Sequence, residues 1–380
     1  MDPEEVKHLP GTIVSELEAK RRGLATVEYT MTNYNNLQYY STLYIGDSQK
    51  AMTFIFDTGS TYLWVPLSNC SWHTSNLYTP AGSFSTSGSR TTITYGSGSV
   101  GGVLCTDNVR AQSSGTAVNM KMLGVDSETS MTGTKADGIV GLTPTTLTSN
   151  ADLFVTKLFS AGVISANGFG IMYRTTTDTS KIVLGGYDTS IVTNSSLFSY
   201  VTLMDTTYWS LPLSKTYYAG SEVSISAKRL ILDTGTSLLY FSTSDWTTIY
   251  DKISSGKTCG YSTVTGYRAW YWTSETEFND ISFQMGNYVY LFPRSSWIYV
   301  RTGGSGGTLC EFYIDSISLS FSTPSILAGD SFLRNYYIYH DVTNKRVGMY
   351  GTYYTTAQGW WMGISTIVPI LGAFFLLMSF

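Results

Sequence analysis

The sequence has few charged residues: Asp, Glu, Lys and Arg make up 13% of its 380 residues, and the net charge is −4. These charges are spread along the chain without a basic block. Proteins that bind nucleic acids normally carry such a block, because lysine and arginine neutralise phosphates. We therefore expect no nucleic-acid partner. The low charge content also suits a protein that works in acid, although many secreted proteins share it.

Histidine and cysteine are also scarce, with three and four residues respectively. His8, His73 and His340 are far apart in the sequence, and no two cysteines have the Cys-x-x-Cys spacing of a zinc site. We therefore predict no metal and no other cofactor. Four cysteines can pair in three ways, so their number alone leaves the connectivity open.

Glycine, serine, threonine and tyrosine are abundant, whereas long segments of helical period are few. This composition is typical of short strands joined by turns, and it predicts an all-β protein. In the body of the chain, helical patterns occur at 151–161 and 243–253. The length leaves room for two domains of ordinary size, each with its own core.

Two similar stretches organise the chain. Residues 54–61 read FIFDTGST, and residues 230–237 read LILDTGTS. In each, an apolar strand delivers one aspartate, Asp57 or Asp233, into a tight turn. Because the copies are roughly half a chain apart, we predict two similar halves that each contribute one carboxylate.

Two carboxylates that meet between such halves predict a specific chemistry. Both would be partly desolvated, and at close range they cannot both ionise, so they share a proton. One can take a proton from water while the other gives a proton to a carbonyl oxygen. This arrangement predicts hydrolysis without a metal or a covalent intermediate.

The residues beside the two aspartates suit supporting roles. Their hydroxyl groups can hydrogen-bond the carboxylates or the opposite half, and their glycines leave N–H groups accessible. These residues are Thr58, Gly59, Ser60, Thr234, Gly235 and Thr236. A single Asp-Thr-Gly turn is more simply explained as a tight loop, but two copies at this spacing favour a catalytic pair.

A glycine-rich hairpin is expected at 91–104. Residues 92–95 alternate like a strand, and GSGS follows at 96–99. Glycines allow such a tip to approach a ligand closely. No helix or lysine follows them, so they do not predict a phosphate site.

Together, these stretches resemble the pepsin-like aspartic proteases, from about residue 37 to 350. The matching motifs are FDTGS at 56–60, LWVP at 63–66, YGSGS at 95–99, DGIVGL at 137–142, VLGG at 183–186, YW at 208–209, DTGTS at 233–237, GDSFLRNYY at 329–337 and RVG at 346–348. Thr61 and Ala328 depart from the usual serine and leucine. Neither departure removes a catalytic group.

The resemblance implies a bilobal, pepsin-like double β-barrel or sandwich with the active site in the cleft between the lobes. Asp57 and Asp233 would be the catalytic pair, and an extended peptide or protein would be the substrate. Thr58 and Thr234 would link the lobes. A flap would close over the substrate, formed by Tyr95, Gly96 and Ser97, with Trp64 as its hydrogen-bonding neighbour. Without the resemblance, ordinary aromatic packing would explain Tyr95 and Trp64.

We divide the chain into a leader (1–36), an N-terminal lobe (37–195), a C-terminal lobe (196–357) and a hydrophobic tail (358–380). The leader contains a short amphipathic helix pattern that ends at Gly23. It is either a solvated leader or the remnant of a zymogen's inhibitory prosegment, in which Lys20, Arg21 or Arg22 could neutralise the active-site carboxylates.

The resemblance also guides the disulfide predictions. Cys259 and Cys310 match the bridge of the family's C-terminal lobe. Cys70 lies in a loop that usually holds a local bridge, but its near partner is missing. We predict that it pairs with Cys105, with two free thiols as the alternative. Two bridges would require an oxidising compartment.

The two ends of the chain bear on location. The acidic N-terminus is not a signal peptide, so we expect the true signal upstream of Met1 or omitted from the sequence. The apolar tail could cross a ~30 Å hydrocarbon layer. We expect a GPI-attachment signal or a transmembrane anchor, with a packed soluble end as a third possibility. Glycosylation sequons begin at Asn69 and Asn194.

We therefore predict an acid-active aspartic endopeptidase, made as a zymogen and acting as a monomer. It would be membrane-anchored in the secretory pathway, at the cell surface or in an endolysosomal or vacuolar compartment. The alternative is a catalytically silent pepsin-like binding or surface protein. Intact Asp57, Asp233 and Tyr95 favour the enzyme.

Overall fold

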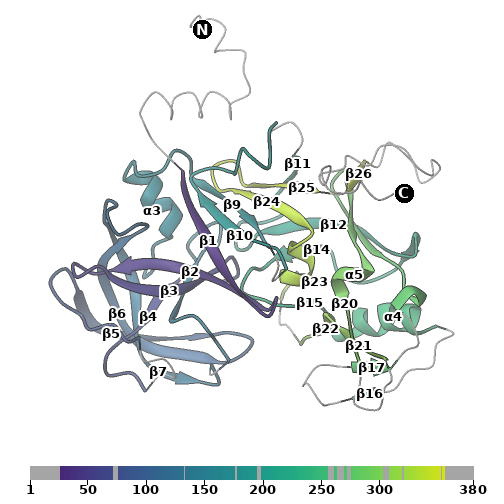
Figure 1. Cartoon of the computed structure of the whole chain (residues 1–380), viewed down its shortest axis with the longest axis horizontal. Helices are drawn as coiled ribbons and strands as arrows, with labels where there is room; N and C mark the ends of the chain where they lie inside the picture. The colour runs from purple at the N-terminus through teal and green to yellow at the C-terminus, as the bar shows by residue number, and fades with distance from the viewer. Residues whose placement is uncertain are drawn as a thin grey trace, which may run out of the picture.

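The computed structural model describes residues 26–355, except 72–75, 132, 176–177, 195–197, 256–260, 263–268, 272–274, 303–307, 319–320 and 352. The chain forms sheets of thirteen, nine and four strands, arranged as two lobes (Figure 1). Helices are few and short among the described residues. The predicted all-β, bilobal fold is therefore confirmed.

The thirteen-stranded sheet contains the N-terminal lobe and the junction between the lobes. In spatial order its strands are β11 (Ser199–Thr202), β25 (Arg346–Gly351), β24 (Tyr336–Asp341), β9 (Gly168–Met172), β10 (Ser180–Leu184), β1 (Val27–Tyr34), β2 (Gln38–Ile45), β3 (Lys50–Asp57), β8 (Gly138–Gly141), β4 (Leu63–Pro66), β7 (Val118–Thr129), β6 (Ser99–Arg110) and β5 (Ser85–Thr94). Residues 27–34, which we placed in the leader, form β1 and pair with β10 and β2.

The C-terminal lobe is built on the two smaller sheets. The larger has the order β22 (Ile314–Ser316), β15 (Leu239–Phe241), β23 (Ser325–Ala328), β14 (Arg229–Leu232), β12 (Ser210–Tyr218), β18 (Ile281–Met285), β19 (Tyr288–Phe292) and β26 (Tyr353–Thr355), and β13 (Ser221–Val223) pairs with β12. The smaller has the order β16 (Tyr261–Ser262), β17 (Ala269–Tyr271), β21 (Thr308–Phe312) and β20 (Ile298–Thr302).

Both predicted helices of the body are present. They are α3 (Phe154–Ser160) and α4 (Thr243–Ser254), and the latter begins at a serine cap, where the Ser242 hydroxyl accepts a hydrogen bond from the Asp245 N–H. Short helical turns complete the described structure: η2 (Glu275–Glu277), α5 (Arg294–Trp297) and α6 (Asp330–Leu333).

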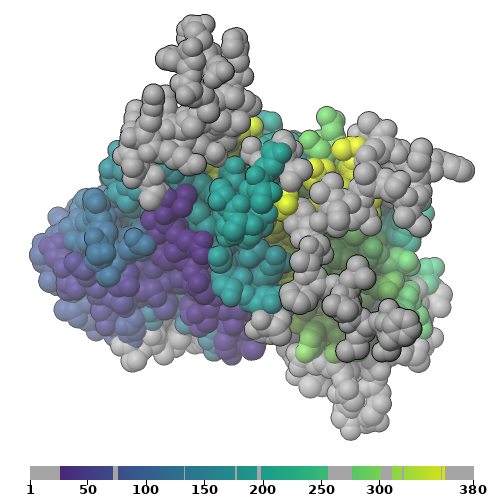
Figure 2. Space-filling model, turned by 45° about the horizontal axis from the view of Figure 1, so that its top comes forward, coloured from purple at the N-terminus to yellow at the C-terminus, as the bar shows by residue number. Residues whose placement is uncertain are grey.

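The lobes share one sheet, because the last long strands of the chain return to the middle of the molecule. Strand β24 pairs antiparallel with β9, with Tyr339 opposite Gly170, and β25 pairs with β11. Figure 2 shows N-terminal residues in purple and C-terminal-lobe residues in green on opposite sides, with teal and yellow residues between them. One large apolar core runs through both lobes. The two halves are therefore held in a fixed relation.

The predicted Cys70–Cys105 bridge is wrong: both thiols are buried and unbridged. Cys70 packs in a small cluster around Trp64, whereas Cys105 packs in the main core and donates to the Met122 carbonyl at 3.5 Å. Successive residues of a strand face opposite sides, and Leu104, beside Cys105, packs in the cluster of Cys70. The sheet therefore separates the two thiols.

Alkylation of the denatured but unreduced protein should consequently label both Cys70 and Cys105. Peptide mapping by mass spectrometry gives the measurement, and a peptide pair linked through these two residues would contradict the structure. In the same digest, Cys259 and Cys310 show whether the other predicted bridge forms.

Some predictions fall on residues outside the described structure. These are the leader helix, Cys259 and the tail at 358–380, so the Cys259–Cys310 bridge and the anchor stay predictions. Within the described part of the chain, no helix has both the length and the apolar character needed to span a bilayer.

Candidate active site

Asp57 and Asp233 occupy equivalent places in the two lobes. Asp57 ends β3, which runs parallel to β8, and Asp233 follows β14, which runs parallel to β23. The backbone turns closely after each strand. A Cβ at Gly141 would overlap the backbone of Ser60 and Thr61, and a Cβ at Gly329 would overlap that of the second turn in the same way. Both lobes therefore use a glycine at the end of the neighbouring strand, or directly after it, to make room for the turn.

The Asp57 carboxylate is held by its own turn. Its Oδ1 accepts a hydrogen bond from the Gly59 N–H at 2.8 Å, and its Oδ2 accepts one from the Ser60 hydroxyl at 2.5 Å. The side chain is buried, with 4% of its surface exposed. These bonds fix the plane of the carboxylate.

The Asp233 carboxylate repeats this pattern. Its Oδ1 accepts from the Gly235 N–H at 2.9 Å, and its Oδ2 accepts from the Thr236 hydroxyl at 2.7 Å. We expected the glycine N–H groups to be accessible to a ligand, but in both turns they bind the aspartate two residues before them. As expected from the sequence, the hydroxyl groups of Ser60 and Thr236 hydrogen-bond the carboxylates.

The two carboxylates face each other across the junction of the lobes. A Cβ placed on Gly59 would lie 2.6 Å from Asp233 Oδ1, and a Cβ on Gly235 would overlap Asp57 Oδ1. Each glycine therefore lies directly against the carboxylate of the other lobe. Two symmetric turns bring together one acid group from each half of the chain.

This setting raises the pKa of both acids. Burial is the largest cause for Asp57, and the charge of Asp233 raises its pKa further, against the opposing hydrogen bonds from Ser60 and Gly59. Burial likewise raises the pKa of Asp233. A proton therefore stays on the pair at a pH where exposed carboxyl groups are ionised.

Thr58 and Thr234 link the two turns below the carboxylates. The Thr58 N–H donates to Thr234 Oγ1 at 2.9 Å, and the Thr234 N–H donates to Thr58 Oγ1 at 2.9 Å. The Thr58 hydroxyl donates to the Leu232 carbonyl at 2.8 Å, and the Thr234 hydroxyl donates to the Phe56 carbonyl at 2.5 Å. These buried, reciprocal bonds fix the spacing of the two turns.

Tyr95 lies over the first turn, at the end of β5. Its hydroxyl accepts a hydrogen bond from the Trp64 indole N–H at 2.8 Å. Burial is the main cause that raises the Tyr95 pKa, and the charge of Asp57 adds to it. The structure thus brings Tyr95 and Trp64 together beside Asp57.

The tip of the β5–β6 hairpin reaches toward the other lobe. The Tyr95 N–H donates to the Gly98 carbonyl at 2.7 Å, so Gly96 and Ser97 form a tight, exposed turn. A Cβ on Gly96 would lie 4.0 Å from Cδ1 of Ile317 in the C-terminal lobe. The hairpin therefore crosses from one lobe to the other above the carboxylates.

Trp209 joins the loops that carry the two aspartates, a role that the sequence did not suggest. Its indole N–H donates to the Leu142 carbonyl at 2.7 Å, and the Leu142 N–H donates to the Asp57 carbonyl at 2.7 Å. Its own carbonyl accepts from the Leu232 N–H at 3.0 Å, immediately before Asp233. The motif at 208–209 was visible in the sequence, but its contacts depend on the fold.

Asp330 was also missed as a neighbour of the pair. It is buried at the start of α6, where burial raises its pKa, the charge of Asp233 raises it further and Arg334 opposes the shift. The GDSFLRNYY motif contains this aspartate, but nothing in its spacing placed it near Asp233.

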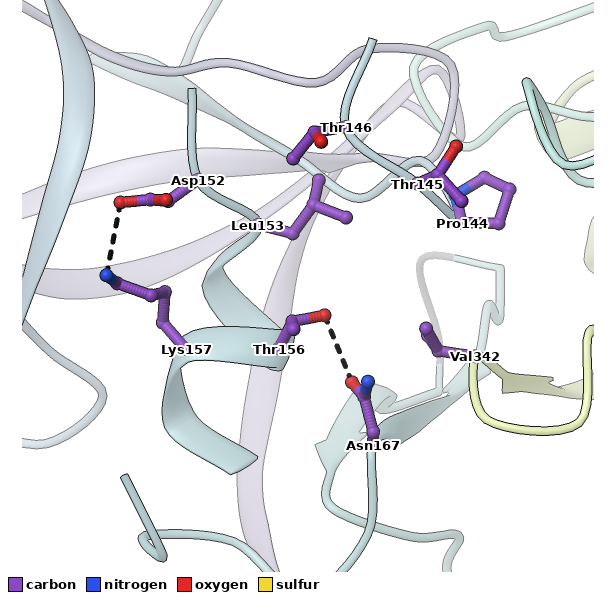
Figure 3. Close-up of a pocket in the computed structure, with 9 residues that line it drawn as sticks. All are labelled: Pro144, Thr145, Thr146, Asp152, Leu153, Thr156, Lys157, Asn167 and Val342. Carbon is purple, nitrogen blue, oxygen red and sulfur yellow. Dashed lines mark hydrogen bonds and ion pairs between the residues drawn. The ribbon is translucent and has the colours of Figure 1, made fainter. Parts of the chain in front are cut away.

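A pocket of about 250 Å³ lies apart from the carboxylates, between α3 and the turn after β24 (Figure 3). Its lining residues are Pro144, Thr145, Thr146, Asp152, Leu153, Thr156, Lys157, Asn167 and Val342. Lys157 pairs with Asp152 at 3.3 Å, and the Thr156 hydroxyl donates to Asn167 at 3.2 Å. None of the predicted site residues lines it.

A bilobal β fold in which two Asp-Thr-Gly turns meet at the centre defines the aspartic protease class. The chain belongs to the eukaryotic aspartyl protease family, whose sequence profile matches residues 38–351. It is 29% identical over 332 residues to pepsin A of Sus scrofa, covering 84% of this chain and 82% of that protein. Pepsin II-2/3 of Oryctolagus cuniculus is 28% identical with the same coverage. Pepsin A of Bos taurus is 28% identical over 335 residues, with 85% and 86% covered.

Proposed function

We propose that this protein is an aspartic endopeptidase that hydrolyses peptide bonds in an extended peptide or protein, with Asp57 and Asp233 as the catalytic pair. One observation carries the proposal: each carboxylate lies against the glycine of the opposite turn. Membership of the aspartyl protease family supports the class of reaction.

The chemistry follows from a proton shared between the two acids. One carboxylate takes a proton from a water molecule, which attacks the peptide carbonyl carbon, while the protonated acid donates to the carbonyl oxygen. Proton transfer to the amide nitrogen then breaks the C–N bond. The hydrogen bonds from Ser60 and Thr236 hold the acids in the orientation that this exchange needs.

The hairpin tip supplies a lid in this proposal. Tyr95, Gly96 and Ser97 would lie over the bound peptide, and the Trp64 hydrogen bond would position the Tyr95 hydroxyl. A lid of this kind excludes bulk water and strengthens the electrostatic interactions within the site.

Activity should be highest in acid and fall as the pH rises. The mechanism needs one proton on the pair, and both acids have raised pKa values, so activity is lost when the last proton leaves. The measurement is kcat/KM against pH on a fluorogenic peptide, with and without a statin-type peptide inhibitor. Glu222→Gln, at an exposed pair with Lys215, is the control and should keep the same profile.

An optimum above pH ~8 would argue against a shared proton. A folded, processed protein without inhibitor-sensitive activity would instead favour a pepsin-like binding protein. We also propose that the protein acts as a monomer in the secretory pathway, that it is synthesised as a zymogen, and that its tail attaches it to a membrane. Mass spectrometry of the mature N- and C-termini tests the last two.

A further inference from the structure

His340 lies in the apolar core of the shared sheet. Its side chain on β24 is fully buried. The ring stacks on Phe169 with 4.5 Å between centroids and 10° between planes, and it meets Trp209 edge-on at 4.7 Å. In the sheet its neighbours are Phe169 of β9 and Val347 of β25. Every one of these contacts is apolar or aromatic.

The imidazole has no polar side-chain partner in the described structure. Neither Nδ1 nor Nε2 forms a hydrogen bond of good geometry there, although the Phe169 backbone acts weakly on the ring. The flanking residues of β24 point to the other face, where Asp341 pairs with Arg346 at 2.9 Å and Tyr339 packs against Tyr187. No carboxylate from β9, β25 or the Trp209 segment, among the described residues, faces the ring. Burial lowers the pKa of His340 to about 3, against a smaller opposing effect of the Phe169 backbone.

The ring is connected to the loops of the candidate active site through Trp209. It contacts Trp209, whose indole binds the Leu142 carbonyl beside the Asp57 loop and whose own carbonyl binds the Leu232 N–H before Asp233. A change that displaces the Trp209 indole therefore acts on both turns at once.

We propose that His340 sets the acid limit of this protein: the fold cannot accommodate an unpaired charge on the ring under Trp209, so uptake of a proton by His340 in acid favours unfolding of the shared sheet and the two aspartate loops. The effect on activity rests on the proposed protease function, whereas the effect on stability does not. His340 thus sets the lower limit of the pH range in which the protein works, and the paired aspartates set the upper limit.

The direction and size of the expected change in folding stability follow from proton linkage. In the unfolded chain a histidine has a pKa of about 6.5, whereas in the fold this one is about 3. Stability from the neutral ring is fully present above pH ~6.5 and is lost as the pH falls, because only the unfolded state takes up the proton. At pH 4.5 this shifts the folding equilibrium about 100-fold toward the unfolded state.

The test compares the unmodified protein with His340→Phe, which keeps an aromatic ring on Phe169. Urea unfolding is measured from pH 7 to pH 4.5. Relative to its value at pH 7, the ratio of the two unfolding constants should grow about 100-fold at pH 4.5. The variant should also retain more peptidase activity after incubation at low pH. Parallel pH dependences of unfolding would overturn the proposal.

Two further measurements keep the test valid if His340→Phe does not fold. His340→Gln is uncharged at every pH and should remove the same acid-dependent loss. A variant with His8→Gln and His73→Gln retains a single histidine, whose NMR signals should not titrate between pH 7.5 and 4.5. Titration near pH 6.5 in the folded protein would overturn the proposal. A stability effect without any activity would refute only the protease function.

Discussion

Replacing Asp57 by asparagine is expected to lower kcat/KM about a thousand-fold or more. Asparagine has the same shape: its Oδ1 can still accept a hydrogen bond from the Gly59 N–H, while its Nδ2, in the place of Asp57 Oδ2, can donate one to the Ser60 hydroxyl oxygen. It cannot share a proton with Asp233, so the acid–base exchange is lost. Burial still raises the pKa of Asp233 in this variant, but a single carboxyl group cannot serve as acid and base in the same step.

The measurement is kcat/KM on the same peptide, together with the thermal unfolding midpoint. The Asp233→Asn variant should lose activity to a similar degree, because neither acid works alone. Asp126→Asn is the matched control, since Asp126 pairs with Arg90 on the surface of the N-terminal lobe. An Asp57→Asn variant that keeps a tenth of the activity would contradict the assignment.

The second large effect is expected from Gly235→Ala. The added methyl group would overlap the carboxylate of Asp57, with Cγ only 2.7 Å away. The carboxylate is fixed by two hydrogen bonds from its own turn, so it cannot move without losing them. Because a displacement of about 1 Å can cost 10²-fold, we expect kcat/KM to fall by at least about that factor.

Gly133→Ala is the matched control for this substitution. Among the described residues, no atom beyond its chain neighbours lies within 4 Å of a Cβ built at Gly133, so the same chemical change meets open space. Both variants are assayed for kcat/KM and for the unfolding midpoint. Equal activity in the two would mean that the turns do not approach each other as closely as the structure has them.

The local sequence was sufficient to predict those elements that depend on a turn motif or on the spacing of apolar residues. The turns at Asp57 and Asp233 follow apolar strands, and the helical patterns at 151–161 and 243–253 became α3 and α4. The glycine-rich hairpin at 91–104 was likewise predicted from its residues, and the resemblance then added the pairing of Tyr95 with Trp64. These features depend on a few adjacent residues, which is why they could be predicted.

Features that depend on distant pairing could not be predicted. Strand β7 begins with alternating burial and continues as a fully buried run, so its period is ambiguous. The error over Cys70 and Cys105 has the same origin, because the sequence does not say on which face of a sheet a cysteine lies. Trp209 and His340 gain their significance only when β24 reaches β9.

The shared sheet also has a consequence for biosynthesis. Strand β9 is complete at Met172, but its partner β24 begins only at Tyr336. A chain emerging from the ribosome therefore carries a core strand with one open edge until nearly all of the described chain has been made, and such long-range pairing is slow to form. The open edge of β9 is therefore the place where a chaperone has most to protect during synthesis.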